Sequence, residues 1–169
     1  LVTGSNGLLG QKIIYALRNK DGIRCISTSR GENRMYAKDG YIYEPLDITD
    51  KNEVKRVLEK YSPNAVINTA AMTNVDACET LREEAWVLNV NTVENLIDTC
   101  KNLNTHLVHL STDFIFNGKK GPYIESDIPE PLSYYAYTKL EAEKKIENSG
   151  LKWSIIRTII IYGVVDGNR

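Results

Sequence analysis

The sequence contains no long apolar run, almost no excess charge and few cysteines. No stretch of about 20 uncharged apolar residues occurs, because the best candidate near the C-terminus is interrupted by Arg157. The 21 Lys and Arg residues nearly balance the 22 Asp and Glu residues, so no bulk positive field is available to attract nucleic acid or anionic lipid. We therefore expect a soluble protein without a nucleic-acid or membrane partner.

Cysteine and histidine are equally scarce. The three cysteines, Cys25, Cys78 and Cys100, are too far apart in the sequence for a zinc site or a redox pair, and their odd number argues against a disulfide framework. His106 and His109 are three residues apart in an expected strand, so they lie on opposite faces and cannot share a metal. We expect a cytoplasmic protein without a metal site, and histidines that are satisfied within the core.

The chain alternates between apolar runs of strand length and amphipathic stretches of helix length. This pattern predicts an α/β fold, in which a parallel sheet is covered by helices on both faces. The expected strands are residues 1–3, 23–28, 41–46, 65–68, 106–111 and 154–158. The expected helices are residues 8–19, 50–60, 83–103 and 133–148, with Asp50 and Ser133 as N-caps. With 169 residues, of which 42% are hydrophobic, the chain can bury the core of one domain.

Three glycines lie between the first expected strand and the first expected helix, in the segment TGSNGLLG at residues 3–10. Gly4 permits a tight turn, and Gly7 lets backbone N–H groups approach a pyrophosphate at the positive end of the helix. Gly10 lets the helix and the strand pack closely. The spacing in this context predicts a dinucleotide site, although glycines also occur in plain turns.

The end of the second expected strand carries Ser29 and Arg30, where an NAD site would usually place an acidic residue. The guanidinium of Arg30 can pair with a ribose 2′-phosphate, which favours NADP(H) over NAD(H). The alternative is that Arg30 is an ordinary solvated surface residue. Asp47 and Ile48 follow the third expected strand. Asp47 could meet an adenine, or it could equally start the next helix.

Tyr135 and Lys139 are four residues apart in an expected helix and therefore lie on one face. Lowering a tyrosine pKa from about 10 by about three units needs roughly 4 kcal/mol. One ammonium about 4 Å away supplies about that much at an effective dielectric constant of about 20. The pair therefore predicts a proton donor, although an amphipathic surface helix would show the same spacing.

Ser111 and Thr112 stand at the carboxyl end of the fifth expected strand, the edge at which open parallel sheets bind ligands. A hydroxyl there can hold a carbonyl oxygen, while local backbone capping is the alternative. The glycine loop, this hydroxyl and the Tyr/Lys pair occur in the order that one site requires.

These residues resemble the extended short-chain dehydrogenase/reductases, together with NTAA at 68–71 and Asn89. Within that family the strings NVDACE at 74–79, HLSTDFIFNG at 109–118 and YIE at 123–125 resemble the dTDP-4-dehydrorhamnose reductases. The resemblance implies one Rossmann-type doubly wound domain over residues 1–169. We expect this domain to be cut at both ends, with a C-terminal substrate lobe largely missing.

The resemblance also implies a mechanism, in which NADPH reduces the 4-keto group of a dTDP-deoxysugar to give dTDP-L-rhamnose. Tyr135 would donate the proton, Lys139 would hold the nicotinamide ribose and lower the Tyr135 pKa, and Thr112 would bind the substrate carbonyl. Asn89 would brace the backbone of the active site, and Ala70 and Ala71 would form a small-side-chain wall. The implied cofactor residues are Gly4, Asn6, Gly7, Leu8, Leu9, Gly10, Ser29, Arg30, Asp47, Ile48, Asn68, Ala70, Ala71, Thr73, Asn89, Tyr135 and Lys139.

Two other functions stay open. A nucleotide-sugar epimerase or dehydratase of the same family would share the cofactor site, although such enzymes usually retain NAD. The regulatory subunit of methionine adenosyltransferase resembles the same subfamily and can carry the Tyr and Lys without a reaction. The sequence also leaves a homodimer open.

Overall fold

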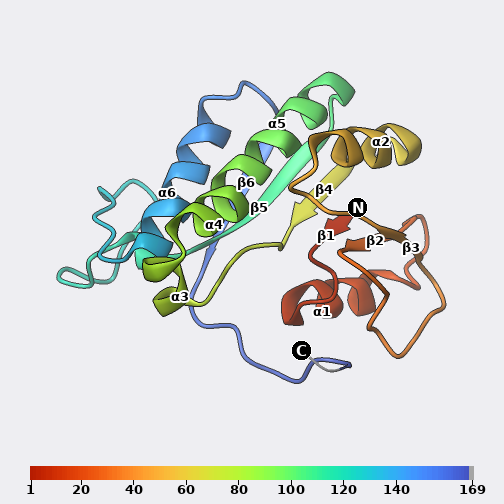
Figure 1. Ribbon diagram of the computed structural model, residues 1–169, viewed down its shortest axis with the longest axis horizontal. Coiled ribbons are helices and arrows are strands. Elements are labelled where there is room, and N and C mark those ends of the chain that lie inside the picture. Colours follow the sequence, from red (N-terminus) through yellow and green to blue (C-terminus); the bar gives the residue numbers. More distant parts are fainter. Residues whose placement is uncertain (168–169) are drawn as a thin grey trace.

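A computed structural model of the chain describes residues 1–167, and its centre is a six-stranded parallel sheet in the order β3-β2-β1-β4-β5-β6 (Figure 1). The predicted Rossmann-type fold is confirmed, because the strand order reverses direction between β1 and β4 as in a doubly wound sheet. The strands are β1 (Val2–Thr3), β2 (Ile26–Ser29), β3 (Ile42–Pro45), β4 (Ala65–Asn68), β5 (His106–Thr112) and β6 (Trp153–Thr158).

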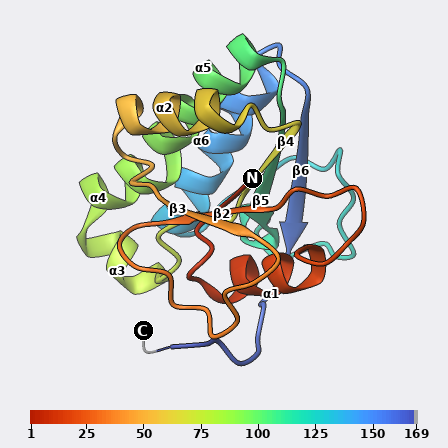
Figure 2. The same cartoon turned by 90° about the vertical axis from the view of Figure 1, so that its right-hand side faces the viewer.

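Helices cover the two faces of the sheet unequally. Figures 1 and 2 show α1 (Leu8–Leu17) on one face, and α2 (Lys51–Tyr61), α5 (Thr92–Leu103) and α6 (Tyr134–Glu147) on the other. The larger core cluster lies under α2, α5 and α6 and includes Val57, Val66 and Leu96, which are fully buried. A smaller cluster around Ile14 lies under α1. Right-handed crossovers place the helices in this way, because the chain moves outward in one direction from β1 to β3 and in the other from β4 to β6.

The predicted helix starts agree with the structure. Asp50 caps α2 by accepting hydrogen bonds from the backbone N–H groups of Asn52 and Glu53, and Ser133 caps α6 by accepting one from Ala136. Each cap satisfies N–H groups that have no partner within the helix.

The helix expected at residues 83–103 is one continuous helical path with a π-helical turn in its middle. It consists of α4 (Arg82–Trp86), the π-helix η1 (Val87–Asn91) and α5. A short helix, α3 (Val75–Thr80), precedes it, and a 3₁₀ turn, η2 (Asp113–Ile115), follows β5. Neither had been expected as a separate element, since their apolar patterns are shorter than two helical turns.

The segment after β6 crosses below the carboxyl ends of the strands and reaches α1 (Figure 1). There Asp166 is held by Gln11, through two hydrogen bonds of 2.7 and 3.0 Å with its backbone, and its carboxylate accepts one from the Tyr15 hydroxyl. None of the helices within residues 1–167 combines the length and the apolar character that crossing a membrane requires.

Candidate functional site

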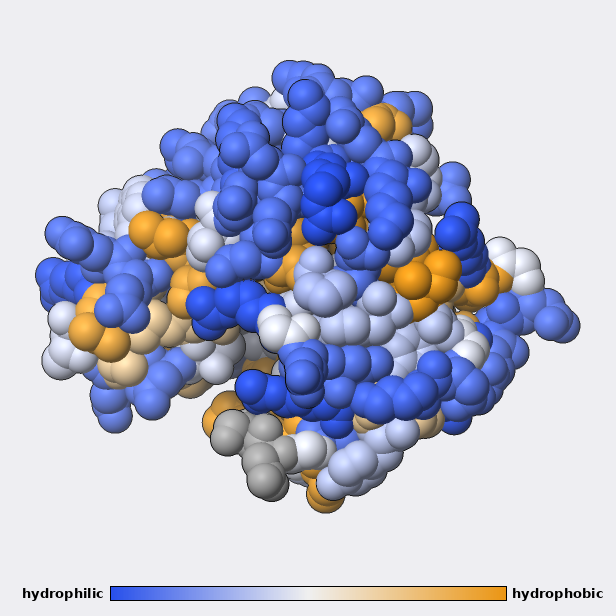
Figure 3. Space-filling model, turned by 45° about the vertical axis from the view of Figure 1, so that its right-hand side comes forward, coloured by the Kyte–Doolittle hydropathy of each residue, from blue (hydrophilic) through white to orange (hydrophobic). Residues whose placement is uncertain are grey.

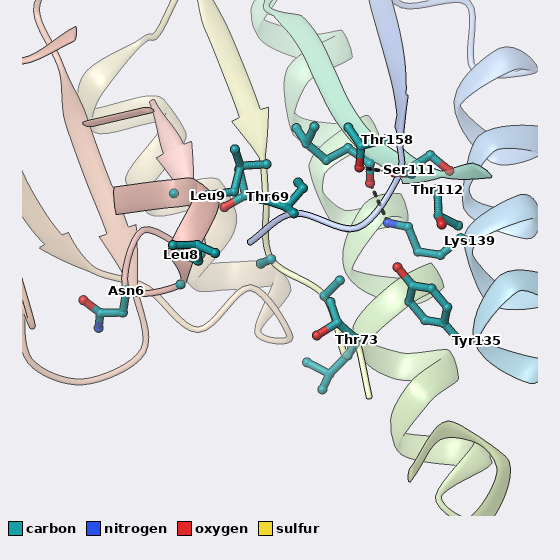
Figure 4. Close-up of a pocket in the computed structure, with 18 of the residues that line it drawn as sticks. Asn6, Leu8, Leu9, Thr69, Thr73, Ser111, Thr112, Tyr135, Lys139 and Thr158 are labelled. Atoms are coloured by element: carbon teal, nitrogen blue, oxygen red, sulfur yellow. Dashed lines mark hydrogen bonds between the residues drawn. The ribbon is translucent and has the colours of Figure 1, made fainter. Parts of the chain in front are cut away.

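A cavity of about 880 Å³ opens at the carboxyl ends of the strands, between the glycine loop and α6. Figure 4 shows Asn6 and Leu8 on one side, and Thr112, Tyr135 and Lys139 on the other. In the space-filling view, apolar residues gather along a hollow between two hydrophilic parts of the surface (Figure 3). The cavity therefore lies at the edge where open parallel sheets bind ligands.

Most of the residues singled out in the sequence line this one cavity. They are Gly4, Asn6, Gly7, Leu8, Leu9, Gly10, Ser29, Arg30, Asp47, Ile48, Ala70, Ala71, Thr73, Thr112, Tyr135 and Lys139. The fold thus brings together segments that are more than 130 residues apart in the chain. Asn68 and Asn89 are buried and lie outside its lining.

The glycine loop is packed too tightly for any side chain at two of its positions. Gly4 has a φ of +67°, and a Cβ there would lie 2.7 Å from the backbone nitrogen of Ala70. A Cβ on Gly10 would lie 2.5 Å from the carbonyl oxygen of Gly4. Gly7 is the N-cap of α1, and no side chain caps that end. The first N–H groups of α1 therefore remain available for an anion in the cavity, where the helix dipole also favours negative charge.

The far end of the cavity is bordered by two arginines. Arg30 follows β2 directly, and Arg34 lies in the next loop; both are exposed and line the cavity. Asn6 holds this loop to the glycine loop, because its side chain donates to the carbonyl oxygen of Glu32 and accepts from the N–H of Arg34. Arg34 was missed at the sequence level, since a lone arginine in a polar loop has no distinguishing spacing.

Asp47 lies in the turn between β3 and α2 and also borders the cavity. Its carboxylate accepts hydrogen bonds of 2.9 and 2.8 Å from the backbone N–H and the hydroxyl of Thr49, so it shapes the turn before α2. It also borders the cavity, together with Ile48. The helix itself begins at Asp50, which is its N-cap.

Thr112, Tyr135 and Lys139 meet at the inner wall of the cavity (Figure 4). Tyr135 and Lys139 both point from α6 toward the end of β5, as their spacing predicted. The Thr112 hydroxyl accepts a hydrogen bond of 3.1 Å from the N–H of Phe114. Ser111 Oγ is buried in the same wall and has no hydrogen-bond partner among the described residues.

The expected lowering of the Tyr135 pKa by Lys139 does not occur in this structure. Burial raises the pKa of Tyr135, and a hydrogen bond with Thr112 only partly offsets that effect. Lys139 is itself almost fully buried, and burial lowers its pKa to about 8 although Glu143 favours its charged form. An ammonium that loses its charge near pH 8 lowers a neighbouring pKa less than an ammonium that stays charged up to its ordinary pKa.

Asn89 and Asn68 hold the backbone around the cavity. The Asn89 amide accepts from the N–H of Met72 at 2.8 Å and donates to the Met72 carbonyl oxygen and to the Thr138 hydroxyl. It thereby ties the π-helix η1 to α6 and to the segment after β4, which is the bracing role expected for it. The amide oxygen of Asn68 accepts hydrogen bonds from the Thr3 hydroxyl and from the N–H of Ala70, and the bond with Thr3 joins β4 to β1.

Three further parts of the cavity wall were not predicted. Ile159, Ile160 and Ile161 line it from the segment after β6, for which the sequence had predicted no part in the site. Leu88 lines it from the π-helix, and Thr69 from the end of β4. An apolar run after a strand does not indicate by itself that the chain turns back across the strand ends.

His109 is buried and both of its ring nitrogens have polar partners, as expected for a satisfied core residue, and one of those partners is Lys139 of the candidate site. Its Nε2 lies 3.0 Å from Lys139 Nζ, and its Nδ1 lies 3.2 Å from Asn68 Nδ2. His106 lies on the other face of β5, where its Nε2 lies 3.0 Å from Ser154 Oγ. Within residues 1–167, His, Cys, Asp and Glu side chains form no group of three or more that could hold a metal ion.

Comparison with known proteins identifies the family. A family model described as the RmlD substrate binding domain matches residues 1–169. The chain belongs to this family. A dTDP-4-dehydrorhamnose reductase from Aggregatibacter actinomycetemcomitans is 33% identical to this RmlD-family chain over 169 residues, which are 99% of the chain and 53% of the relative. Methionine adenosyltransferase 2 subunit beta from Bos taurus is 31% identical over 168 residues, which are 98% of the chain and 48% of the relative.

A solved structure supports the same assignment. dTDP-4-dehydrorhamnose reductase from Bacillus anthracis, crystallised in complex with NADP, superposes with a TM-score of 0.80 at 28% identity. The match covers 99% of this RmlD-family chain and 55% of the crystallised chain. The chain thus spans about half the length of the relatives it matches.

Proposed function

We propose that this chain is the NADPH-binding part of a reductase that converts the 4-keto group of a dTDP-deoxysugar to a hydroxyl, forming dTDP-L-rhamnose. The observation that carries the proposal is the meeting of Thr112, Tyr135 and Lys139 at one wall of a cavity whose opposite side is the uncapped start of α1. The relative from Aggregatibacter actinomycetemcomitans, which carries the name of this reductase, supports the substrate class.

The residues at the glycine loop fit a dinucleotide. The N–H groups that begin α1 suit a pyrophosphate, and Gly7 has no side chain to occupy the space in front of them. Arg30 and Arg34 border the cavity where a ribose 2′-phosphate would need positive charge, which supports NADPH over NADH. The NADP complex of the relative from Bacillus anthracis supports the same choice.

Bound NADPH supplies the hydride that adds to the keto carbon. The residues of the chain manage the oxygen: Thr112 donates a hydrogen bond to the carbonyl oxygen and holds it beside Tyr135. Tyr135 passes its hydroxyl proton to that oxygen, so the oxygen becomes the product hydroxyl and Tyr135 becomes a phenolate. Lys139 lies beside Tyr135, and its charged form stabilises that phenolate (Figure 4). Apolar groups such as Leu88 and Ile159 line the same cavity and reduce the number of polar groups that compete for the carbonyl oxygen.

The test is NADPH oxidation by the full-length protein with freshly made dTDP-4-keto-6-deoxy-L-mannose, with NADH measured in parallel. We expect turnover with NADPH at a rate well above that with NADH. Tyr135→Phe should abolish turnover and leave the NADPH dissociation constant unchanged. Unchanged turnover in that variant would remove Tyr135 from the role of proton donor.

A non-catalytic role is the second candidate, and one comparison favours it. The relative from Bos taurus is named as a subunit of methionine adenosyltransferase 2, and it matches the chain as completely as the reductase does. A regulatory subunit would bind NADPH without oxidising it in the presence of the keto-sugar. Calorimetric NADPH binding without turnover would therefore support the second candidate over the first.

A further inference from the structure

His109 is a buried titratable residue to which the proposed reaction assigns no role. Its side chain is 1% exposed, and both ring nitrogens have a polar neighbour. Burial and the neighbouring Lys139 hold the pKa of His109 well below its usual range, so the ring is neutral. A neutral imidazole carries one hydrogen, and the neighbours decide which nitrogen holds it.

Asn68 determines one side of this choice. Asn68 and His109 are register partners on the adjacent parallel strands β4 and β5, which places their side chains together on one face of the sheet. The oxygen of the Asn68 amide accepts hydrogen bonds from the Ala70 N–H at 3.2 Å and from the Thr3 hydroxyl at 2.6 Å. Because a backbone N–H can only donate, this oxygen must face Ala70, and the NH₂ group must face His109 Nδ1.

The position of the hydrogen on the His109 ring decides what the ring offers to Lys139. Asn68 Nδ2 donates to His109 Nδ1, so the hydrogen of the ring is on Nε2, which faces Lys139 Nζ at 3.0 Å. A neutral amine can accept that hydrogen and still donate to the carbonyl oxygen of Leu110 at 2.7 Å. An ammonium has no lone pair to accept it. If Lys139 is charged and the ring hydrogen is on Nε2, that N–H faces the ammonium of Lys139. If the hydrogen is on Nδ1 instead, that N–H faces the NH₂ group of Asn68.

We propose that His109 is a positioning residue for Lys139: Asn68 fixes its Nε2–H tautomer, and that tautomer favours the neutral amine of Lys139. The inference rests on the proposed function only in giving Lys139 a role in catalysis. This series of hydrogen bonds from Asn68 through His109 to Lys139, called the relay below, makes the charge on Lys139 responsive to pH within the working range of the enzyme. Lys139 then takes up a proton from solvent, stabilises the Tyr135 phenolate as the ammonium, and returns that proton to the phenolate to restore the Tyr135 hydroxyl.

Other charged and titratable groups lie on α6 and on the elements that pack against it. Glu143, one turn later on α6, favours the ammonium form, but its carboxylate is paired with Arg157 from β6 at 2.7 Å. Tyr135 lies beside Lys139 on α6, while Cys78 of α3 and Asp113 of η2 act on Tyr135. From α5, Glu94 is held at the surface by Lys145. His109 of β5 is the group among these that contacts Nζ directly.

The tautomer can be observed directly by nitrogen NMR of the full-length protein at pH 8.5, without cofactor. The His109 ring is assigned by its through-space contact with the Asn68 amide. We expect the hydrogen on Nε2 and the lone pair on Nδ1. A hydrogen on Nδ1 would overturn the proposal. This measurement uses the unmodified protein, so it decides the question even if every His109 variant fails to fold.

The effect on Lys139 is measured by NMR titration of its side chain, which is assigned with Lys139→Arg. In His109→Gln, the amide can turn its oxygen toward Nζ, so the ammonium gains an acceptor and its ionisation constant should fall tenfold or more. His109→Asn, which keeps an acceptor near Asn68 and removes the donor at Nζ, should change it in the same direction. His106→Gln is the matched control, because it changes a histidine on the other face of β5 and should leave Lys139 unchanged. An unchanged Lys139 titration in both His109 variants would overturn the proposal.

The pH dependence of turnover connects the relay to catalysis. Where the full-length enzyme reduces the keto-sugar, the alkaline limb of kcat should move to higher pH in His109→Gln, while His106→Gln should follow the unmodified enzyme. An alkaline limb that stays in place would show that His109 does not act through Lys139. Absence of turnover in the unmodified protein would contradict the proposed reaction alone, because the two NMR measurements need no substrate.

Discussion

Removal of Arg157 from its ion pair with the buried Glu143 should cost more stability than removal of one partner from an exposed surface pair. The Glu143 side chain is 1% exposed, and it accepts from Arg157 Nε at 3.2 Å and from Nη2 at 2.7 Å. Arg157 Nη1 also donates to the carbonyl oxygen of Glu125, and the guanidinium lies over the ring of Phe116. Arg157→Met would leave the Glu143 carboxylate buried without its partner.

Removal of one member of a buried pair typically costs about 3–5 kcal/mol, since the remaining charge keeps its desolvation penalty. A typical domain is stable by only about 5–15 kcal/mol, so Arg157→Met should lose a large part of the free energy of unfolding. The matched control is Lys51→Met. Lys51 pairs with Asp98 at 2.6 Å, but these side chains are 64% and 55% exposed. Because water already screens that pair, its loss should be too small to measure despite the short distance.

The assay is urea unfolding at pH 7, followed by circular dichroism, on the unmodified protein, both single variants and Glu143→Leu/Arg157→Met. The double variant should recover most of the loss of Arg157→Met, because it removes the unpaired charge as well as the pair. The reasoning would be refuted if Arg157→Met lost no more stability than Lys51→Met. It would also be refuted if the double variant were as unstable as Arg157→Met.

Three further predictions concern the glycine loop, the arginines and the response to acid. Gly10→Ala should destabilise the protein by about 1–3 kcal/mol, because the new Cβ would meet the Gly4 carbonyl oxygen at 2.5 Å; thermal unfolding measures this. Arg30→Ala should weaken NADPH binding by roughly tenfold, with a similar further loss in Arg30→Ala/Arg34→Ala, and leave NADH binding unchanged. The pKa of Glu44 is lowered to about 2 by hydrogen bonds with Lys60, Tyr61 and Arg56, so the stability it contributes is present above about pH 5 and is lost as the pH falls toward 2. The stability difference between the unmodified protein and Glu44→Gln should therefore shrink over that range in urea unfolding.

Each of these predictions has an outcome that contradicts it. A higher melting temperature in Gly10→Ala would mean that helix propensity, which favours Ala over Gly by about 1 kcal/mol, outweighs the contact. Equal losses of NADPH and NADH affinity in Arg30→Ala would place Arg30 away from the 2′-phosphate. A difference between the unmodified protein and Glu44→Gln that stays constant from pH 6 to pH 2 would mean that the Glu44 carboxylate is not stabilised by its partners.

The local signals of the sequence predicted much of the fold and of the candidate site. Helix and strand positions follow from apolar periodicity, and the N-caps at Asp50 and Ser133 from residue type, since both depend on neighbours within a few residues. The pairing of Tyr135 with Lys139 on one face follows from helical geometry alone. The π-helical turn around Asn89 could not be predicted in this way, because periodicity alone did not reveal the extra residue in the turn.

The sequence by itself predicted the fold class, through the alternation of strand and helix patterns along the chain. It also predicted the glycine loop at the start of α1 and the candidate site residues Thr112, Tyr135 and Lys139, because each of these signals lies within one segment. The tertiary structure decided what surrounds them. The register of β4 against β5 places Asn68 beside His109, and the packing of α6 on β5 places His109 against Lys139. The segment after β6 becomes part of the cavity wall only because it returns to α1. Burial, which lowers the pKa of Lys139 to about 8, arises from elements far apart in the chain and has no signature in the local sequence.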